Sequence, residues 1–470
     1  MRCCFITLGC RVNQYESDAM AELVTQAGFE ITENPAEADV CIVNTCTVTN
    51  IADRKSRQML SKAHKLNPNA KLIAAGCFAQ RSPEAAAKLE GVYAVLGSAD
   101  KNRVVELVKS IAEGRENEPK SEKCNCGEKE LCDCCGGMKK FEQPENSECS
   151  GNAAGGAKIL VRDVMHEHEF EEMSAVHEGR TRAYLKIQDG CNMFCTYCAI
   201  PYARGGLRSR SIESVRAEAE KLNNGGFSEV VLTGIHLMSY GRDLRSGTDI
   251  RDAVRCFDGL DNIKRIRFGS LEPHMMTDEI IAELADNKRI CRQFHLSLQS
   301  GCDATLKRMN RHYDTAFYRE LVARIRRQFD NPSITTDIMV GFPGETEEEF
   351  EQSLAFAREI GFAKVHVFAY SVRPGTRAAR MPDQLTRQQK EQRSRQMAAV
   401  TEESRRQFLQ GQVGLEEEVL IETETLNGMQ HGYTKNYTPV CVRAQEDLSG
   451  RICRGRGVEA EGDYCIGIIL

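Results

Sequence analysis

The sequence predicts an α/β protein with an N-terminal parallel α/β domain, a central partial (β/α)6 barrel and a small C-terminal antiparallel β-barrel. Three observations predict it. The chain has 470 residues, which is too long for one compact core and suggests about three domains. Apolar runs alternate with helical patterns over most of its length, as parallel sheets require. Residues 410–470 instead show short alternating runs broken by Gly and Asn, typical of an antiparallel barrel.

Composition narrows the class of protein. Hydrophobic residues make up 41% and charged residues 28%, and no apolar run approaches the roughly 18 residues of a membrane span. The N-terminus does not resemble a signal peptide, so we expect a cytoplasmic protein. The net charge of −6 argues against wholesale coating of nucleic acid but permits a local basic groove. With 21 cysteines and no export signal, metal binding is a better interpretation than disulfides.

The N-terminal domain, predicted over residues 1–113, repeats one pattern three times. Each repeat has an apolar run, then a cysteine, then a helical pattern. The runs are Cys3–Leu8 before Cys10, Val40–Asn44 before Cys46, and Leu72–Ala75 before Cys77. Loops that follow parallel strands lie along one edge of a sheet, where ligands bind. We therefore expect these three cysteines to converge.

Residues 114–180 are predicted to be a linker with a cysteine-rich insertion. Gly, Glu, Lys, Asn and Ser become frequent, and no long helical period survives. The inserted cysteines are Cys124, Cys126, Cys132, Cys134, Cys135 and Cys149. Their spacing suits a soft metal, but a disordered insertion is the simpler alternative, and the sequence does not assign their role.

The central domain, predicted over residues 181–409, contains six strand–helix units. The strand candidates are Tyr184–Gln188, Glu229–Thr233, Arg265–Ser270, Phe294–Leu298, Ile334–Val340 and Lys364–Ala369. Six such units predict an open or partial barrel, in which chemistry takes place at the C-terminal ends of the strands. A charged helical stretch over Pro382–Gln410 precedes the last domain.

A compact cysteine motif follows the first of these strands. Cys191, Cys195 and Cys198 lie within eight residues, and three thiolates so spaced can hold three irons of a [4Fe–4S] cluster. The fourth iron would then keep an open position. The alternatives are a structural zinc knuckle or reduced loop cysteines, but zinc would require a fourth Cys or His nearby.

This spacing, with Tyr197 before the last cysteine, resembles the signature of the radical S-adenosylmethionine (SAM) superfamily. Within it, the chain resembles the methylthiotransferase family over nearly its whole length. The last domain looks like the TRAM domain, the small RNA-binding barrel of this family. The segments that carry the resemblance are Leu8–Ser17, Asn44–Thr49, Gly76–Cys77, Cys191–Cys198, His295–Gly301, Asp337–Thr346, Tyr370–Thr376 and Gly432–Tyr437.

The residues after Cys10 favour one branch of the family. The segment Cys10–Ser17 resembles the enzymes that act on N6-threonylcarbamoyladenosine at position 37 of tRNA. The resemblance implies two [4Fe–4S] clusters, one on Cys191, Cys195 and Cys198 that cleaves SAM to a radical, the other on Cys10, Cys46 and Cys77 that presents sulfur. It also implies an electron donor and a sulfur source, which the sequence does not identify. No catalytic side chain beyond the cluster ligands is expected.

The resemblance and the strand ends together suggest contacts to SAM and to RNA. The SAM candidates are Tyr197, Thr233, Gly234, Ser270, Glu272, Ser297 and Gln299. The RNA candidates are Arg204, Arg208 and Arg210 for phosphates and Tyr433, Asn436 and Tyr437 for unpaired bases. Arg54, Lys55 and Arg57, early in the helix after Cys46, are further phosphate candidates. From Gly411 onward there are ten acidic and five basic residues, which is unfavourable for non-specific phosphate binding.

Two other interpretations remain open at this stage. The same chemistry on another substrate would make the protein a methylthiotransferase of isopentenyladenosine in tRNA or of a ribosomal protein. A protein that retains the fold without activity would be an iron–sulfur carrier.

Overall fold

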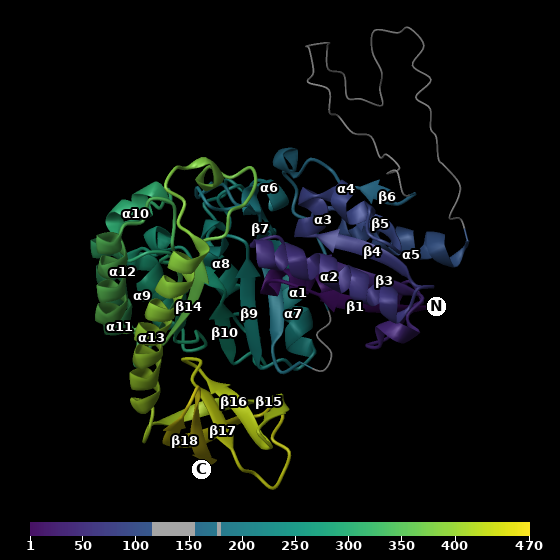
Figure 1. The fold of residues 1–470 in the computed structure, drawn as a ribbon. Helices are drawn as coiled ribbons and strands as arrows, with labels where there is room; N and C mark the ends of the chain where they lie inside the picture. Colours follow the sequence, from purple (N-terminus) through teal and green to yellow (C-terminus); the bar gives the residue numbers. More distant parts are fainter. Residues whose placement is uncertain (115–155, 176–179) are drawn as a thin grey trace.

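The computed structural model describes residues 1–114, 156–175 and 180–470. Figure 1 shows an N-terminal α/β domain beside a central barrel, with a small β-barrel below the central one. The six cysteines of the insertion lie outside the described residues. No described helix is long and apolar enough to cross a membrane.

The N-terminal domain is a six-stranded parallel sheet in the order β2-β1-β3-β4-β5-β6. Helices α1 and α5 cover one face, and α2, α3 and α4 cover the other, so the sheet is buried on both sides. The strands are β1 (Arg2–Thr7), β2 (Glu30–Ile31), β3 (Val40–Thr45), β4 (Lys71–Gly76), β5 (Val92–Leu96) and β6 (Lys158–Leu160). The helices are α1 (Arg11–Gln26), α2 (Asn50–Leu66), α3 (Cys77–Arg81), α4 (Pro83–Ala87) and α5 (Val104–Ala112).

The structure differs from the predicted linker over 114–180 at its end. Residues 158–160 form β6, which pairs with β5 and completes the N-terminal sheet. A run of three residues is too short to show a strand period, and only its pairing with Val95 and Leu96 defines it. The linker prediction was therefore wrong for this segment.

The central domain is the predicted partial barrel, with one addition. Among the described residues, seven parallel strands in two sheets occupy the six predicted strand positions, and the short strand β8 pairs antiparallel with β7. The expected strand over Arg265–Ser270 is broken at Gly269 into β10 and β11, which belong to two different sheets. The strands are β7 (Ala183–Asp189), β8 (Arg208–Ser209), β9 (Glu229–Gly234), β10 (Arg265–Phe268), β11 (Ser270–Leu271), β12 (Gln293–Leu296), β13 (Ser333–Val340) and β14 (Lys364–Ala369).

Helices surround this barrel and share one hydrophobic core with its strands. They are α6 (Ile200–Arg204), α7 (Ile212–Asn224), α8 (Ile250–Arg255), α9 (Asp278–Asp286), α10 (Asp303–Arg308), α11 (Thr315–Gln328), α12 (Glu347–Ile360) and α13 (Arg387–Gln410). The 24-residue helix α13 leads to the last domain.

The C-terminal domain is a closed barrel in the order β15-β16-β17-β19-β18. Its strands pair antiparallel except for β17 with β19, which are parallel. It packs on the end of the central barrel where β9 and β10 begin, since Arg265 donates to the carbonyl oxygens of Tyr433 and Glu418 at 3.0 and 2.8 Å. The strands are β15 (Glu416–Leu426), β16 (Met429–Thr434), β17 (Pro439–Val442), β18 (Ile452–Glu461) and β19 (Tyr464–Ile469).

Candidate metal centres

The dispersed cysteines lie at the C-terminal ends of three neighbouring parallel strands. Cys10 follows β1 and immediately precedes α1, Cys46 follows β3, and Cys77 is the first residue of α3 after β4. Cys46 and Cys77 are buried, and Cys10 lies at the exposed edge. The strand order β1-β3-β4 brings the three together, as the sequence pattern predicts.

Two glycines allow these loops to approach each other. Gly9 has φ +106°, and a Cβ there would lie 2.9 Å from the Cβ and 3.1 Å from the Sγ of Cys46. Gly76 has φ +88°, and a Cβ there would lie 2.3 Å from the Oδ1 of Asn44. Only glycine combines this backbone conformation with so close an approach, so both cysteine loops depend on it.

Polar side chains fix the same loops. The Nδ2 of Asn13 donates to the carbonyl oxygens of Leu8 at 2.7 Å and Thr45 at 3.0 Å. The hydroxyl of Ser56 accepts from the Cys46 N–H at 3.1 Å and donates to the Cys46 carbonyl at 3.0 Å. The backbone around two of the three cysteines is therefore held in place by the protein itself.

Arg204, the last residue of α6, reaches from the central domain into this site. Its Nε lies 3.2 Å from the Sγ of Cys77. Its Nη2 donates to Asn13 Oδ1 at 2.6 Å and to Glu16 Oε2 at 3.0 Å, and its Nη1 lies 3.3 Å from Asp189 Oδ2. The side chain is fully buried. One guanidinium thus joins a candidate ligand of the first domain to a strand of the second.

Two buried lysines complete this charge cluster. Lys186 lies 2.8 Å from Glu16 and 2.6 Å from Asp189, and Lys101 lies 3.2 Å from Glu16. Burial opposes ionisation of Glu16, but Arg204, Lys101 and Lys186 outweigh it and lower its pKa to about 2. Asp189 is affected in the same way, and its pKa lies well below the usual range. Both carboxylates are ionised, so a network of buried cations and anions lies beside Cys77.

The compact triad lies on the loop between β7 and α6. The Cys198 N–H donates to the Cys195 carbonyl at 2.9 Å, and the Cys191 N–H donates to the Gly205 carbonyl at 3.0 Å. The Thr196 N–H donates to the carbonyl of Met309 at 3.0 Å. The loop is thereby tied to α6 and to the segment after α10.

Arg311 contacts a sulfur of the compact triad, as Arg204 contacts a sulfur of the dispersed triad. Its Nη1 lies 3.2 Å from the Sγ of Cys195, and its Nη2 lies 2.8 Å from both carboxylate oxygens of Glu272. Burial opposes ionisation of Glu272, but hydrogen bonds from His236 and His274 and the charge of Arg311 hold its pKa well below the usual range. A second buried arginine therefore donates to a candidate ligand sulfur.

The donor sets suit clusters better than single ions. Within residues 1–114, 156–175 and 180–470, no three His, Cys, Asp or Glu side chains form a group that could hold one metal ion. A structural zinc site requires a fourth Cys or His ligand, whereas three cysteines can hold a cubane and leave one of its irons free. N–H donors to sulfur, as Arg204 and Arg311 provide, are a usual part of the surroundings that tune such clusters.

Burial also keeps the free thiols protonated. It raises the pKa of Cys46 to about 12, that of Cys198 to about 12 and that of Cys191 to about 11. A metal ligand must be a thiolate, so loading these sites requires loss of the thiol protons.

A third arginine joins the two domains beside Cys46. Arg373, after β14, donates to the Thr47 hydroxyl at 2.7 Å, to Asp53 at 2.8 Å and to the Asn50 side chain at 2.6 Å. The segment Tyr370–Thr376, one of those that carry the family resemblance, thus holds the loop that follows Cys46. Sequence reasoning did not single out Arg311 or Arg373 because neither lies in a motif with metal-ligand spacing.

Comparisons with known proteins agree with this geometry. The model of the Radical SAM superfamily matches residues 185–357, and that of "Uncharacterized protein family UPF0004" matches residues 2–97. The threonylcarbamoyladenosine tRNA methylthiotransferase MtaB of Bacillus subtilis is 36% identical, over 98% of this chain and 94% of its own. The chain belongs to the radical SAM methylthiotransferase family.

The methylthiotransferase is also similar to further members of the family and to a solved radical SAM structure. MtaB of Thermotoga maritima is 33% identical over 92% of this chain and 89% of its own. A tRNA-2-methylthio-N(6)-dimethylallyladenosine synthase of Pelotomaculum thermopropionicum is 31% identical, with the same two coverages. The radical SAM methyltransferase TsrM of Kitasatospora setae has a TM-score of 0.55 at 16% identity, covering 80% of this chain and 76% of its own. The last likeness confirms the fold alone.

The methylthiotransferase carries the expected SAM candidates along one edge of its barrel. Thr233 and Gly234 end β9, Ser270 lies on β11, and Ser297 directly follows β12. Gln299 has φ +71° and is held by backbone bonds to β13. Glu272 is occupied by Arg311, and Tyr197 packs beside Met309, Phe342 and Tyr370. Tyr197 belongs to the loop of the compact triad, and the other six lie on or just after β9, β11 and β12.

The three arginines expected to contact phosphates are buried, and that expectation was wrong. Arg204, Arg208 and Arg210 are at most 4% exposed. Arg208 donates to the Arg204 carbonyl at 2.9 Å, and Arg210 donates to Tyr15 at 3.2 Å and pairs with Glu172 at 3.1 Å. Arg204 pairs with Glu16 and Arg210 donates to Tyr15 across the domain boundary, contacts that the sequence does not reveal.

The C-terminal candidates also face the protein. Tyr433 and Tyr437 stack on each other with ring centroids 4.4 Å apart, and the guanidiniums of Arg182 and Arg267 lie over the Tyr437 ring at 5.5 and 4.5 Å. Asn436 is fully buried and donates to the Asn331 carbonyl at 3.1 Å. Asn436 is therefore not available to a base, and the prediction was wrong for it. The tyrosines help to dock this barrel on the central one.

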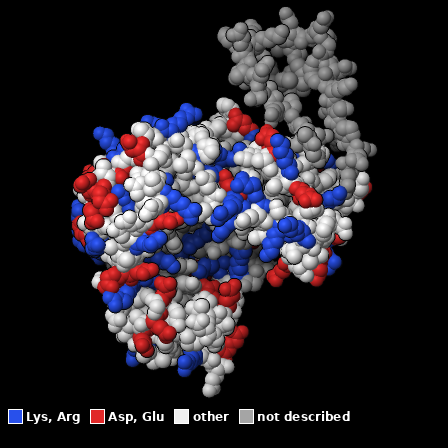
Figure 2. Space-filling view, viewed as in Figure 1, with Lys and Arg blue, Asp and Glu red and all other residues white. Residues whose placement is uncertain are grey.

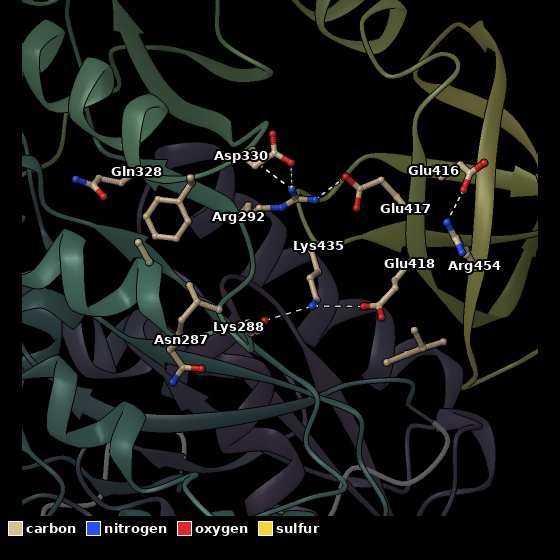
Figure 3. Close-up of a pocket in the computed structure, with 14 residues that line it drawn as sticks. Asn287, Lys288, Arg292, Gln328, Asp330, Glu416, Glu417, Glu418, Lys435 and Arg454 are labelled. Carbon is tan, nitrogen blue, oxygen red and sulfur yellow. Dashed lines mark hydrogen bonds and ion pairs between the residues drawn. The ribbon is translucent and has the colours of Figure 1, made fainter.

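A cavity of about 750 Å³ lies between these two barrels, and none of its lining residues belongs to either cysteine triad. Figure 3 shows that Arg292 of the central domain reaches Glu417 of the C-terminal barrel, while Lys435 pairs with Glu418 within that barrel. Arg292 lies 3.2 Å from Asp330 and 2.5 Å from Glu417, and Lys435 lies 3.4 Å from Glu418. We interpret it as part of the docking surface, since residues of both barrels line it and Arg292 pairs with Glu417 across the boundary.

Proposed function

We propose that the protein is a tRNA methylthiotransferase that converts N6-threonylcarbamoyladenosine at position 37 to its 2-methylthio derivative. The observation that supports this most directly is the 36% identity over 98% of the chain to the enzyme MtaB. That likeness coincides with two separate triads of cysteines, each with a buried arginine on one sulfur. An iron–sulfur carrier without activity would not require an arginine of the central domain, Arg204, to contact Cys77 of the second triad.

The two cysteine triads would hold clusters with different tasks. Cys191, Cys195 and Cys198 would hold one [4Fe–4S] cluster, and Cys10, Cys46 and Cys77 would hold the other, each with one iron free of protein ligands. When bound, the first cluster with SAM supplies the one-electron chemistry that an inert ring C–H bond requires, and the second supplies a place for the sulfur.

The protein's own side chains bind, orient and exclude water. Tyr197, Thr233, Gly234, Ser270, Glu272, Ser297 and Gln299 are the residues we propose as the surroundings of SAM. Arg204 and Arg311 stabilise thiolate charge at Cys77 and Cys195 through N–H donation. Arg373 and Arg204 hold the two domains in the relative position in which one substrate base can reach both sites. An electron donor, a sulfur source and a cytoplasmic location belong to the same proposal.

Nucleoside mass spectrometry of tRNA tests the substrate. The gene should restore 2-methylthio-N6-threonylcarbamoyladenosine to a strain that lacks it, and a Cys46→Ala gene should not. Restoration of the isopentenyladenosine derivative alone would favour the second candidate, which the 31% identity to the dimethylallyladenosine synthases supports. Restoration of neither would contradict both.

A further inference from the structure

The helix α2 follows Cys46 by a few residues and presents a basic face. Ser56, Leu60 and Ala63 pack inward against the sheet. The residues on the opposite side are exposed and carry five positive charges, on Arg54, Lys55, Arg57, Lys62 and Lys65. Figure 2 shows blue side chains gathered on this face, over the helix that Figure 1 labels α2.

These side chains form a groove rather than a scattered set. A depression of about 440 Å³ is lined by six residues, all from α2 and none acidic: Arg54, Arg57, Gln58, Ser61, Lys62 and Lys65. From Arg54 to Lys65 the helix rises by about 16 Å, at about 1.5 Å per residue. One nucleic-acid strand advances about 3.4 Å per phosphate, so the groove spans about four or five phosphates.

The positive charge of this face is not neutralised by the part of the chain that the structure describes. The one acidic residue of α2, Asp53, is turned to Arg373 at 2.8 Å. The basic residues of α13 differ, because Arg387 lies 2.6 Å from Glu391 and Arg406 pairs with Glu403. In a chain with a net charge of −6, an uncompensated stripe of this kind attracts anions.

We propose that this face of α2 binds the phosphate backbone of the RNA substrate next to the reacting base. The inference rests on the proposed function and supplies what the C-terminal barrel lacks. That barrel has ten acidic and five basic residues, and its tyrosines are occupied at a domain boundary. The face of α2 carries cations without such acidic neighbours, and α2 begins at Asn50, four residues after Cys46.

A charge-neutralising variant tests the inference on the full-length protein. Arg54→Gln/Lys62→Gln/Lys65→Gln removes three charges and spares Arg57, which packs over Phe78 next to Cys77. The probe is a tRNA anticodon stem-loop, and its affinity is measured by fluorescence anisotropy over a series of salt concentrations. Each lost phosphate contact lowers the slope of log K against log salt by about 0.7–0.9. We expect a slope reduced by about 2–3 and an affinity at least tenfold weaker at low salt.

Matched variants separate the surface from general charge effects. Arg387→Gln/Arg395→Gln/Arg406→Gln removes the same charge from exposed positions of α13 and should leave the slope unchanged. Arg54→Lys/Lys62→Arg/Lys65→Arg keeps the charge on α2 and should retain it, which excludes a folding defect as the cause. An unchanged slope in the neutralised α2 variant, or an equal loss in the α13 variant, would overturn the inference. If the wild-type gene failed to produce methylthiolated tRNA in cells while the neutralised α2 variant still showed a reduced salt slope, only the proposed function would be overturned.

Discussion

The two cysteine triads reach similar surroundings by different routes. Cys191, Cys195 and Cys198 share one loop, whereas the other three cysteines are spread over residues 10–77 and meet only because β1, β3 and β4 are neighbours. Each triad has one arginine nitrogen 3.2 Å from a sulfur. Arg311 belongs to the same domain as its triad, but Arg204 crosses from the barrel. The dispersed site is therefore complete only when the two domains are packed together.

The electrostatic surroundings differ as well. Arg311 is paired with one buried carboxylate, Glu272. Arg204 shares Glu16 and Asp189 with two buried lysines. The compact site relies on one ion pair, and the dispersed site on a network in which no single cation is the only partner of an anion.

Loss of the compact triad should have the largest effect. Cys195→Ala removes the ligand that Arg311 contacts, so we expect no 5′-deoxyadenosine from SAM and no methylthiolated tRNA. Anaerobic assays of the reconstituted protein with a reductant measure both products by chromatography and mass spectrometry. Persistence of 5′-deoxyadenosine would remove this triad from the role assigned to it.

Loss of the dispersed triad should abolish one of the two products and leave the other. In Cys46→Ala we expect no methylthiolated tRNA, while 5′-deoxyadenosine is still formed because the compact triad is intact. The same assay measures this, with the wild type as its reference. If both products disappeared, the two sites would not be separable.

The two arginines should differ in their contribution to stability. Arg311→Met leaves Glu272 buried with only His236 and His274 nearby, and we expect a loss of about 3–5 kcal/mol in the free energy of unfolding. Arg204→Met leaves Glu16 and Asp189 facing Lys101 and Lys186, and we expect about 1–3 kcal/mol. Urea denaturation of the cluster-free proteins followed by circular dichroism measures both; the reverse order would contradict the comparison.

The ion-pair network around Arg204 should also make the stability of the protein depend on pH in the acid range. The pKa of Glu16 is lowered from 4.5 to about 2, so its ionised form stabilises the folded state above pH 4.5, and this contribution is lost as the pH falls through about 2. Glu16→Gln lacks it and should be less stable by at most about 3 kcal/mol at neutral pH. The difference from the wild type should narrow between pH 4.5 and 2 in denaturation curves. A difference independent of pH would mean that Glu16 acts through packing alone.

The sequence predicted the candidate cluster cysteines better than the side chains that surround them. The repeat of strand, cysteine and helix was sufficient to place Cys10, Cys46 and Cys77 on one sheet edge, because parallel topology fixes where loops lie. The partial barrel followed from apolar runs that alternate with helical patterns, and the closed C-terminal barrel from short alternating runs broken by Gly and Asn.

What the sequence could not show are the contacts between domains. Arg204, Arg208 and Arg210 were expected on the surface because three arginines in seven residues resemble a phosphate site. Arg204 pairs with Glu16, and Arg210 contacts Tyr15 and Glu172, all of which are distant in the sequence. Only the packing of one domain on another converts such residues from exposed cations into buried ion pairs.

Iron and sulfide analysis of anaerobically reconstituted protein tests the central claim, that the chain has two independent cluster sites, most directly. We predict about eight irons per chain for the wild type and about four for both Cys46→Ala and Cys195→Ala, since each cubane contains four. About four irons in the wild type, or loss of all iron from either variant, would contradict the account.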